Sequence, residues 1–365
     1  MGMIELEDVV KRFPGTEAPA VDHLTLSIPR GALVTLVGPS GCGKTTTLKM
    51  INRIIEPTSG RITIDGASAD SRPPHLLRRS IGYVIQQVGL FPHRTIAENI
   101  ATVPELLEWD KARIDQRVGE LTDLVGLEAS MLERYPSELS GGQQQRVGVA
   151  RALAADPPVL LMDEPFGAVD PIVRAHLQDQ LVDLQQRLRK TIVFVTHDID
   201  EAIKLGDLIC ILNVGGKIEQ YGPPAEILSS PANAFVEDFL GGERGLRRLG
   251  LLPVDSAEMQ RGPVVDVSAT VEAARSVMAA HGLDWVTVLA DDRLLGWLGQ
   301  DDLDGAGALD ALQPRDFLVT LERTSSLRKA LDAVVTGHAR VAVVVEGARY
   351  LGMLDLEAIA EEITE

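Results

Sequence analysis

The residues with the clearest chemistry form the glycine-rich stretch GPSGCGKT (38–45), which ends in Lys44 and Thr45. It follows the apolar run LVTLV (33–37) and precedes TTLKMINRI (46–54), so it fits G-x-x-x-x-G-K-[ST] between a strand and a helix. Glycines let backbone N–H groups surround an anion, and the helix start adds a positive dipole. Lys44 would reach the β- and γ-phosphates of ATP, and the Thr45 hydroxyl would bind Mg²⁺. The expected nucleotide-binding residues are Gly38, Pro39, Ser40, Gly41, Cys42, Gly43, Lys44, Thr45 and Thr46.

Two carboxylates follow an apolar run in VLLMDEP (159–165). A buried strand that ends in two carboxylates is costly unless they have partners or a chemical role. Beside a phosphate-binding loop, Asp163 would hold Mg²⁺ and Glu164 would polarise the attacking water as general base. A strand that merely ends in acidic residues is the alternative.

A second glycine-rich helix start, LSGGQQQR (139–146), lies about 20 residues before that strand. The same physics makes it a second anion site. The residues at this helix start that would contact the anion are Ser140, Gly141, Gly142 and Gln143.

With these motifs in this order, the chain resembles the ATP-binding subunits of ABC transporters, whose signature is LSGGQ. The resemblance covers residues 1–240 and implies further roles. Asp170 in GAVD matches the D-loop residue, His197 in VTHD the switch histidine at the γ-phosphate, and Gln86 the Q-loop glutamine at Mg²⁺ and the attacking water. Phe13 in KRFPG stands where the family stacks an aromatic ring on adenine, although a plain core residue is the alternative. For Cys42, a small loop-filling residue is favoured over a redox role.

These residues require a fold that brings strand ends together. Residues 1–240 alternate continuous apolar β-runs with helical patterns, which predicts an α/β domain with a mainly parallel sheet. The resemblance adds a helical subdomain to this P-loop NTPase domain. Residues 241–256 are rich in Gly and Arg and are interpreted as a linker. Residues 257–365 contain two similar segments in which Gly296 and Gly352 hold the same place, which predicts a tandem repeat.

The sequence is particularly similar to importer subunits for osmoprotectants such as glycine betaine, carnitine, choline and proline betaine. Those subunits carry a C-terminal pair of CBS modules, of βαββα form, which fits the repeat. The resemblance implies a head-to-tail dimer in which the signature of one copy closes over the P-loop nucleotide of the other. It also implies membrane permease subunits and a separate substrate-binding protein as partners, and a peripheral location at the cytoplasmic face of the inner or plasma membrane.

Composition is compatible with these expectations. The net charge of −18 argues against nucleic acid as a partner, and the two cysteines suit a reducing compartment. The start of the sequence does not predict a signal peptide, and the apolar runs fall far short of the ~18 residues of a membrane helix. An ABC ATPase that imports another small solute, or one with no transport role, is the alternative. A nucleotide sensor with a degenerate cassette is disfavoured by intact Lys44, Asp163, Glu164 and His197.

The C-terminal repeat raises the question of an effector. CBS pairs often bind adenosine nucleotides through a Thr or Ser and an Asp in each copy, but this sequence has Gly299 and Asp302, then Asp355 and Ala358. A nucleotide effector in that mode is therefore disfavoured, and the resemblance implies other signals, either a cyclic dinucleotide or ionic strength read against lipid charge. From Glu258 onward the chain carries 19 acidic and nine basic residues, so regulation by screened electrostatics is a hypothesis. A packing or dimerisation module is the alternative.

One apolar segment is unusual. IGYVIQQVGLFPH (81–93) begins as a buried strand, then has two glutamines and an apolar loop bounded by Gly and Pro. Gln86 would end its strand at the Mg²⁺ site. Gln87 and residues 88–92 would form part of a groove that receives a short cytoplasmic helix of the permease, since exposed apolar patches usually bind a partner.

Overall fold

The computed structural model describes residues 2–86, 89–167, 169–304, 306–337 and 339–364. Gln87 and Val88, which the sequence places in the permease groove, lie outside these ranges. The chain divides into two compact units, residues 1–240 and 241–365.

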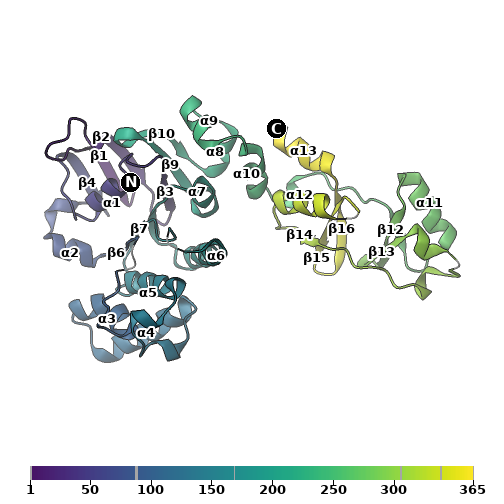
Figure 1. Cartoon of the computed structure of the whole chain (residues 1–365), viewed down its shortest axis with the longest axis horizontal. Helices are drawn as coiled ribbons and strands as arrows, with labels where there is room; N and C mark the ends of the chain where they lie inside the picture. Colours follow the sequence, from purple (N-terminus) through teal and green to yellow (C-terminus); the bar gives the residue numbers. More distant parts are fainter. Residues whose placement is uncertain (1, 87–88, 168, 305, 338, 365) are drawn as a thin grey trace. The chain divides into compact units, whose positions relative to one another are not determined.

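The first unit contains two sheets (Figure 1). The six-stranded sheet has the order β10-β9-β3-β8-β7-β6, in which only the β10–β9 pair is antiparallel. Every residue of β3, β7 and β8 is buried, as expected for parallel strands covered on both faces. The mainly parallel sheet predicted from the apolar runs is confirmed. Its strands are β3 (Leu33–Val37), β6 (Ile81–Val84), β7 (Val159–Asp163), β8 (Thr191–Val195), β9 (Leu208–Asn213) and β10 (Lys217–Gly222).

The second sheet of this unit is antiparallel and has the order β2-β1-β4-β5. Strand β2 alternates buried and exposed residues, which is the pattern of a strand with one solvated face. The strands are β1 (Ile4–Lys11), β2 (Val21–Ile28), β4 (Ser59–Ile64) and β5 (Ala67–Ser68).

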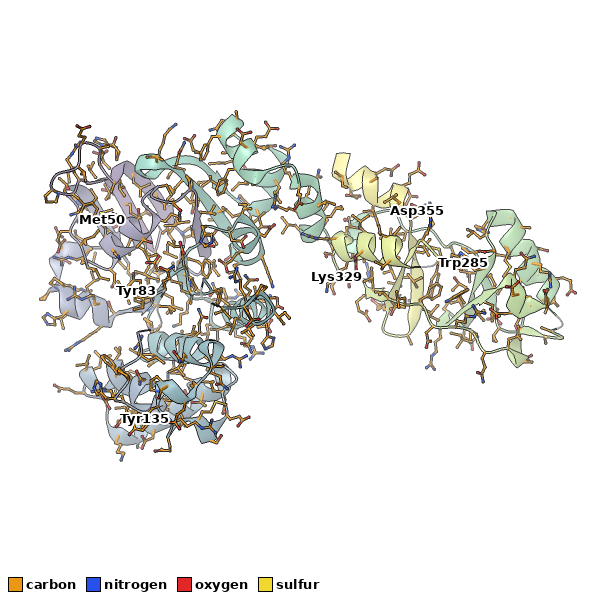
Figure 2. All side chains as sticks on the ribbon, viewed as in Figure 1. Met50, Tyr83, Tyr135, Trp285, Lys329 and Asp355 are labelled. Carbon is orange, nitrogen blue, oxygen red and sulfur yellow. The ribbon has the colours of Figure 1, made fainter. Side chains whose placement is uncertain are left out.

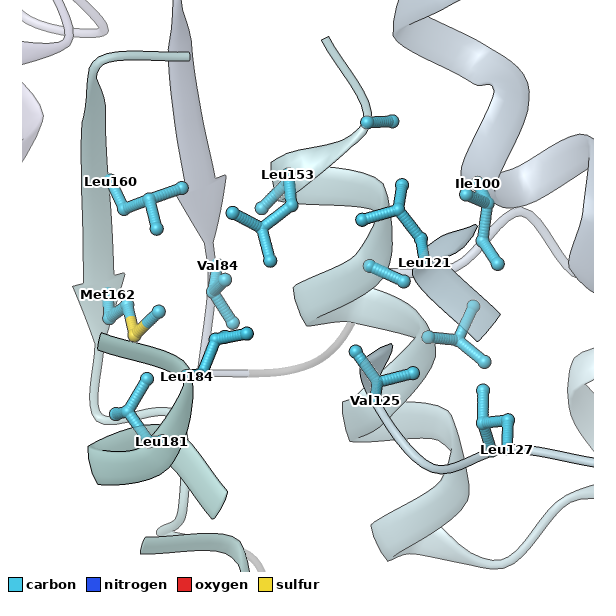
Figure 3. Close-up of a cluster of buried hydrophobic side chains, with 14 of the residues drawn as sticks. Val84, Ile100, Leu121, Val125, Leu127, Leu153, Leu160, Met162, Leu181 and Leu184 are labelled. Atoms are coloured by element: carbon cyan, nitrogen blue, oxygen red, sulfur yellow. The ribbon is translucent and has the colours of Figure 1, made fainter. Parts of the chain in front are cut away.

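Three helices form a separate helical subdomain, as the family resemblance implies: α3 (Ile96–Leu106), α4 (Lys111–Leu124) and α5 (Gly141–Leu153). One buried cluster joins it to the sheet (Figure 3). Leu121 and Leu153 of the subdomain share this cluster with Val84 and Met162 of the strands and Leu184 of α6. The remaining helices of the unit are α1 (Lys44–Ile51), α2 (Pro74–Arg79), α6 (Pro171–Leu188), α7 (Ile199–Leu205), α8 (Pro224–Ser229) and α9 (Ala234–Leu240).

The second unit is built on one six-stranded sheet of order β11-β12-β13-β16-β15-β14. The order is symmetric about the central β13–β16 pair, so two copies of a β-α-β-β segment lie side by side. The first copy comprises β11 (Val264–Asp266), α11 (Val271–His281), β12 (Trp285–Ala290) and β13 (Arg293–Gly299). The second comprises β14 (Thr320–Glu322), α12 (Leu327–Thr336), β15 (Ala342–Glu346) and β16 (Arg349–Leu354). The repeat inferred from the sequence is therefore present in the structure.

The two copies end differently. The second copy continues into α13 (Leu356–Thr364), whereas the first ends in a single 3-10 turn, Gln300–Leu303. The sequence DGAG that follows this turn contains poor helix formers, which explains the early stop.

The copies are also interlocked. Gln260, before the first copy, exchanges two backbone hydrogen bonds with Met353 of the second, at 3.0 and 2.8 Å. Arg315, before the second copy, exchanges two with Trp297 of the first, both at 2.9 Å. Between the copies lies a small apolar cluster that includes Trp285, which is labelled in Figure 2.

The interpretation of residues 241–256 as a linker needs correction. Residues Arg244–Leu251 form helix α10, whose Leu249 is fully buried in the core of the second unit with residues of α12 and α13. Leucines at 246 and 249 are spaced three apart and fit one helical face, but the abundant Gly and Arg obscured this short pattern.

Candidate functional site

The loop between β3 and α1 has the backbone geometry of an anion cradle. Gly38 has φ +155°, and a Cβ there would lie 2.0 Å from the Leu212 carbonyl oxygen. Gly43 has φ +102°, and a Cβ would lie 2.7 Å from the Ala20 carbonyl oxygen. Gly41 has φ +79° and faces open space. Glycine is thus required at the two ends of the loop by close backbone approach, and the middle of the loop is left open for a ligand.

Lys44 is buried at the start of α1 and is held by the same loop. Its Nζ donates hydrogen bonds to the carbonyl oxygens of Gly38 at 2.7 Å and Pro39 at 3.0 Å. The ammonium group is therefore fixed within the cradle. Cys42 is fully buried with its Sγ 3.6 Å from this Nζ, which fits the loop-filling interpretation of the thiol.

The Thr45 hydroxyl donates a hydrogen bond of 2.8 Å to Oδ1 of Asp163, which ends β7. Burial raises the pKa of the Asp163 carboxyl above its usual value. The Thr45 hydrogen bond and the charge of Lys49 offset this rise only in part. The Thr45 hydroxyl and the Asp163 carboxylate lie side by side, and both are oxygen ligands of the type that Mg²⁺ prefers. The residues present therefore fit the expected metal.

Glu164 joins the two other residues expected to act in hydrolysis. Gln86 Nε2 donates to Oε2 of Glu164 at 3.2 Å, and Nδ1 of His197 lies 3.3 Å from the same oxygen. The three side chains come from the ends of β6, β7 and β8, which are neighbours in the parallel sheet. The His197 side chain is 62% exposed and that of Glu164 is 23% exposed, so the group opens to solvent.

The backbone of Glu164 is strained. Its φ is +44°, in the left-handed region that costs a non-glycine residue about 1–3 kcal/mol. Its N–H donates to the carbonyl oxygen of Val195, two residues before His197. The turn after β7 is thus tied to the strand that presents the histidine.

The signature residues occupy the first turn of α5. The Ser140 hydroxyl accepts from the backbone N–H of Gln143, and Gln143 Oε1 accepts from the N–H of Ser140. Among the described residues, no hydrogen bond joins Ser140, Gly141, Gly142 or Gln143 to the P-loop. The helix start is preformed, but the two glycine-rich loops are not linked within one chain.

Within the part of the chain that the structure describes, no hydrogen bond or ion pair joins Phe13 or Asp170 to Glu164. Phe13 is 37% exposed, with Lys11 Nζ 5.2 Å from its ring centre, so it is not a core residue. Asp170 caps α6 by accepting from the N–H of Val173. Both side chains are exposed at the surface, where a nucleotide or a partner could reach them.

Sequence reasoning missed two features near the site. Tyr83 of β6 lies on the same sheet face as Asp163, and burial followed by the Asp163 charge raises the pKa of its hydroxyl. Gln178 and Glu201 form a buried hydrogen bond between α6 and α7. Side chains alternate between the two faces of a strand, so the pairing of β6 with β7 could have predicted that Tyr83 shares a face with Asp163. No local sequence pattern marks the Gln178–Glu201 pair.

Residues 21–167 match the ABC transporter family. The osmoprotectant import ATP-binding protein of Salmonella typhimurium is 46% identical over 99% of this chain and 96% of its own length. The chain belongs to the ATP-binding proteins of ABC transporters. The glycine betaine/carnitine/choline transport ATP-binding protein of Bacillus subtilis is 51% identical over 83% of this chain and 80% of its own.

Solved structures agree with this assignment. The first unit of this ABC ATP-binding protein is similar to a dimeric ATP-binding cassette in a post-hydrolysis state with ADP and phosphate. The TM-score is 0.55 and the identity 34%, over 61% of this chain and 99% of the other. Proteins of this family are ATPases coupled to transport. None of this protein's helices, within the described ranges, combines the length and apolar character of a membrane-spanning segment.

Proposed function

We propose that this protein is the ATP-hydrolysing subunit of an importer for quaternary-amine osmoprotectants such as glycine betaine, carnitine or choline. The observation that carries the proposal is the 46% identity to an osmoprotectant import protein along nearly the whole of both chains, including the second unit. The test is uptake of labelled glycine betaine, choline and carnitine by the source cell after deletion of the gene. Uptake of at least one should be lost, and should return with the parental chain but not with Lys44→Ala. Unchanged uptake of all three would refute this solute class.

In this proposal, ATP would bind with its phosphates in the P-loop, and Mg²⁺ would be held by Thr45, Asp163 and Gln86. The metal supplies charge neutralisation for phosphoryl transfer. Lys44 orients the β- and γ-phosphates, Glu164 accepts a proton from the attacking water, and His197 contacts the γ-phosphate. The convergence of Gln86 and His197 on one Glu164 oxygen supports this assignment.

A second copy of the chain would complete each site. Ser140, Gly141, Gly142 and Gln143 would close over the partner's nucleotide, with Asp170 beside them and Phe13 stacked on adenine. The preformed first turn of α5 supports this role, because a capped helix start presents oriented backbone dipoles to an anion.

A groove of about 350 Å³ would receive the permease. It is lined by residues of β6, α2, α3 and α5, together with the loop that carries Gly89 and Phe91. Asn99 fixes this loop by accepting from the Phe91 N–H and donating to its carbonyl oxygen, while Arg151 donates to the Gly89 carbonyl oxygen. Phe91 is 41% exposed, so its aromatic ring lies at the surface while hydrogen bonds hold Gly89 and Phe91 in place. The protein would thereby sit at the cytoplasmic face of the membrane, and a separate binding protein would select the solute.

The second unit would be a regulatory CBS pair. Asp302 is already engaged by Arg315 at 2.6 Å and by the N–H of Gly299, and Asp355 accepts from the N–H of Ala358. These contacts, with the missing hydroxyls at 299 and 358, favour an electrostatic signal over an adenosine nucleotide. Because α10 packs in this unit, the test is truncation after Leu240. Loss of the salt dependence of transport in vesicles would support regulation by ionic strength, and an unchanged salt response would refute it.

A further inference from the structure

Gln178 of α6 and Glu201 of α7 form a buried polar pair that the proposed hydrolysis does not use. Gln178 Nε2 donates a hydrogen bond of 3.0 Å to Oε1 of Glu201. The two residues are only 8% and 7% exposed. Burial raises the pKa of Glu201, while hydrogen bonds from the Thr196 hydroxyl and the Gln178 amide act in the opposite direction.

The surroundings of the pair connect two segments of the site. The Glu201 N–H donates to Oδ1 of Asp198, which follows His197, and the Asp198 N–H donates to the hydroxyl of Thr196, which precedes it. The charge of Arg174 also acts on Glu201, and Arg174 Nη2 donates to the carbonyl oxygen of Val169, immediately before Asp170. Glu201 is thus tied through its backbone to the loop that carries His197, and through its side chain to α6, the helix that Asp170 caps.

A buried polar pair is a poor way to join two helices for stability alone. Replacing both partners of a buried hydrogen bond with apolar groups of the same shape can be nearly neutral or stabilising. We propose that Gln178 and Glu201 are positioning residues that hold the His197 loop in register with the Asp170 end of α6 during ATP hydrolysis. This inference rests on the proposed function, since it acts through His197.

The decisive variant is the double replacement Gln178→Leu with Glu201→Leu in the full chain. We expect kcat for ATP to fall about tenfold, because small displacements of a reacting group are costly. KM for ATP should stay within about twofold, since the P-loop contacts are untouched. If the pair only packs α6 against α7, the leucine variant should fold and keep the parental kcat. That result would overturn the proposal.

The exchanged pair Gln178→Glu with Glu201→Gln restores a donor and an acceptor at the same positions. We expect its kcat to return to within about threefold of the parent, as for coupled neighbours. An exchanged pair as slow as the leucine pair would also overturn the proposal. If the leucine pair fails to fold, Gln178→Met is tested in its place. Its kcat should also fall about tenfold, and a parental kcat would overturn the proposal.

Gln185 provides a matched control on the same helix. Its amide donates to the carbonyl oxygens of Gly31 and Lys190, and neither acceptor belongs to the loop that carries His197. Gln185→Leu should lower the melting temperature but keep the parental kcat. His197→Ala is measured in parallel: a parental rate there would refute the site assignment itself. A slow His197→Ala with a parental leucine pair would refute the positioning role alone.

Discussion

Thr45 and Asp163 are hydrogen-bonded at 2.8 Å although 118 residues separate them in the sequence. Thr45 lies in the first turn of α1, and Asp163 ends a central strand of the sheet that α1 covers. The fold itself therefore brings together the two groups that we propose as Mg²⁺ ligands.

Thr45→Val should weaken the metal site because it removes one oxygen donor and leaves the buried Asp163 without its hydrogen bond. We expect the Mg²⁺ concentration for half-maximal ATPase activity to rise about tenfold, in line with losses at metal-site residues. A titration of Mg²⁺ at fixed ATP measures this. Thr45→Ser is the control and should remain near parental. Equal Mg²⁺ dependence in the valine variant would contradict the assignment.

Glu164→Gln should remove the general base and keep the shape of the side chain. Turnover should fall by about 10²-fold or more. ATP-bound dimers should then accumulate if, as proposed, ATP closes the head-to-tail dimer and hydrolysis opens it. Light scattering after gel filtration in Mg²⁺ and ATP would detect them. Lys44→Ala, which loses the phosphate contact, should remain monomeric, and persistent turnover in Glu164→Gln would show that another group is the base.

Phe13→Ala should raise KM for ATP with little change in kcat, because an adenine-stacking ring contributes binding in the ground and transition states alike. Base stacking on an aromatic ring contributes about 1–3 kcal/mol, so a rise of roughly tenfold is expected. Phe13→Tyr should behave like the parent. A drop in melting temperature without a change in KM would instead indicate a structural role.

Phe91→Ala should impair coupling to the permease more than it impairs ATP binding. The ring is exposed on an ordered loop, so its loss should leave the ATP site intact. The comparison is solute uptake against nucleotide affinity in the assembled transporter. Equal losses in both would argue against a permease contact at this loop.

Gly296→Ala should destabilise the second unit. Gly296 has φ +138°, and its Cβ would lie 2.4 Å from the Arg315 carbonyl oxygen. We expect a loss of about 2–4 kcal/mol in the free energy of unfolding, as for other strained backbone sites. Urea unfolding followed by tryptophan fluorescence would report it through Trp285 and Trp297. Gly307→Ala, which meets no atom within 4 Å, is the control, and identical midpoints would contradict the prediction.

Local motifs predicted much of the nucleotide site. The P-loop pattern implies its own strand and helix, so the cradle and the position of Lys44 follow from a few consecutive residues. The apolar runs of β3, β7 and β8 likewise predict a parallel sheet because both faces are covered.

Other features depend on contacts that no local pattern records. The Gln178–Glu201 pair joins two helices through a single buried hydrogen bond, and neither residue type nor spacing distinguishes it from a solvated helix face. Helix α10 was missed because Leu249 is its one fully buried residue and its Gly and Arg content resembles a linker. The strained φ of Glu164 is equally invisible without the sheet around it.

The exchanged hydrogen bonds of Gln260 with Met353 and of Arg315 with Trp297 also bear on ancestry. Each copy of the repeat is completed by the segment that leads into the other. An ancestor with a single copy would have left these backbone groups to water or paired them with a second chain. In the second case, duplication of the gene would have turned an association between two molecules into a fold within one. We therefore expect a fragment that holds one copy alone to be less stable than the paired unit.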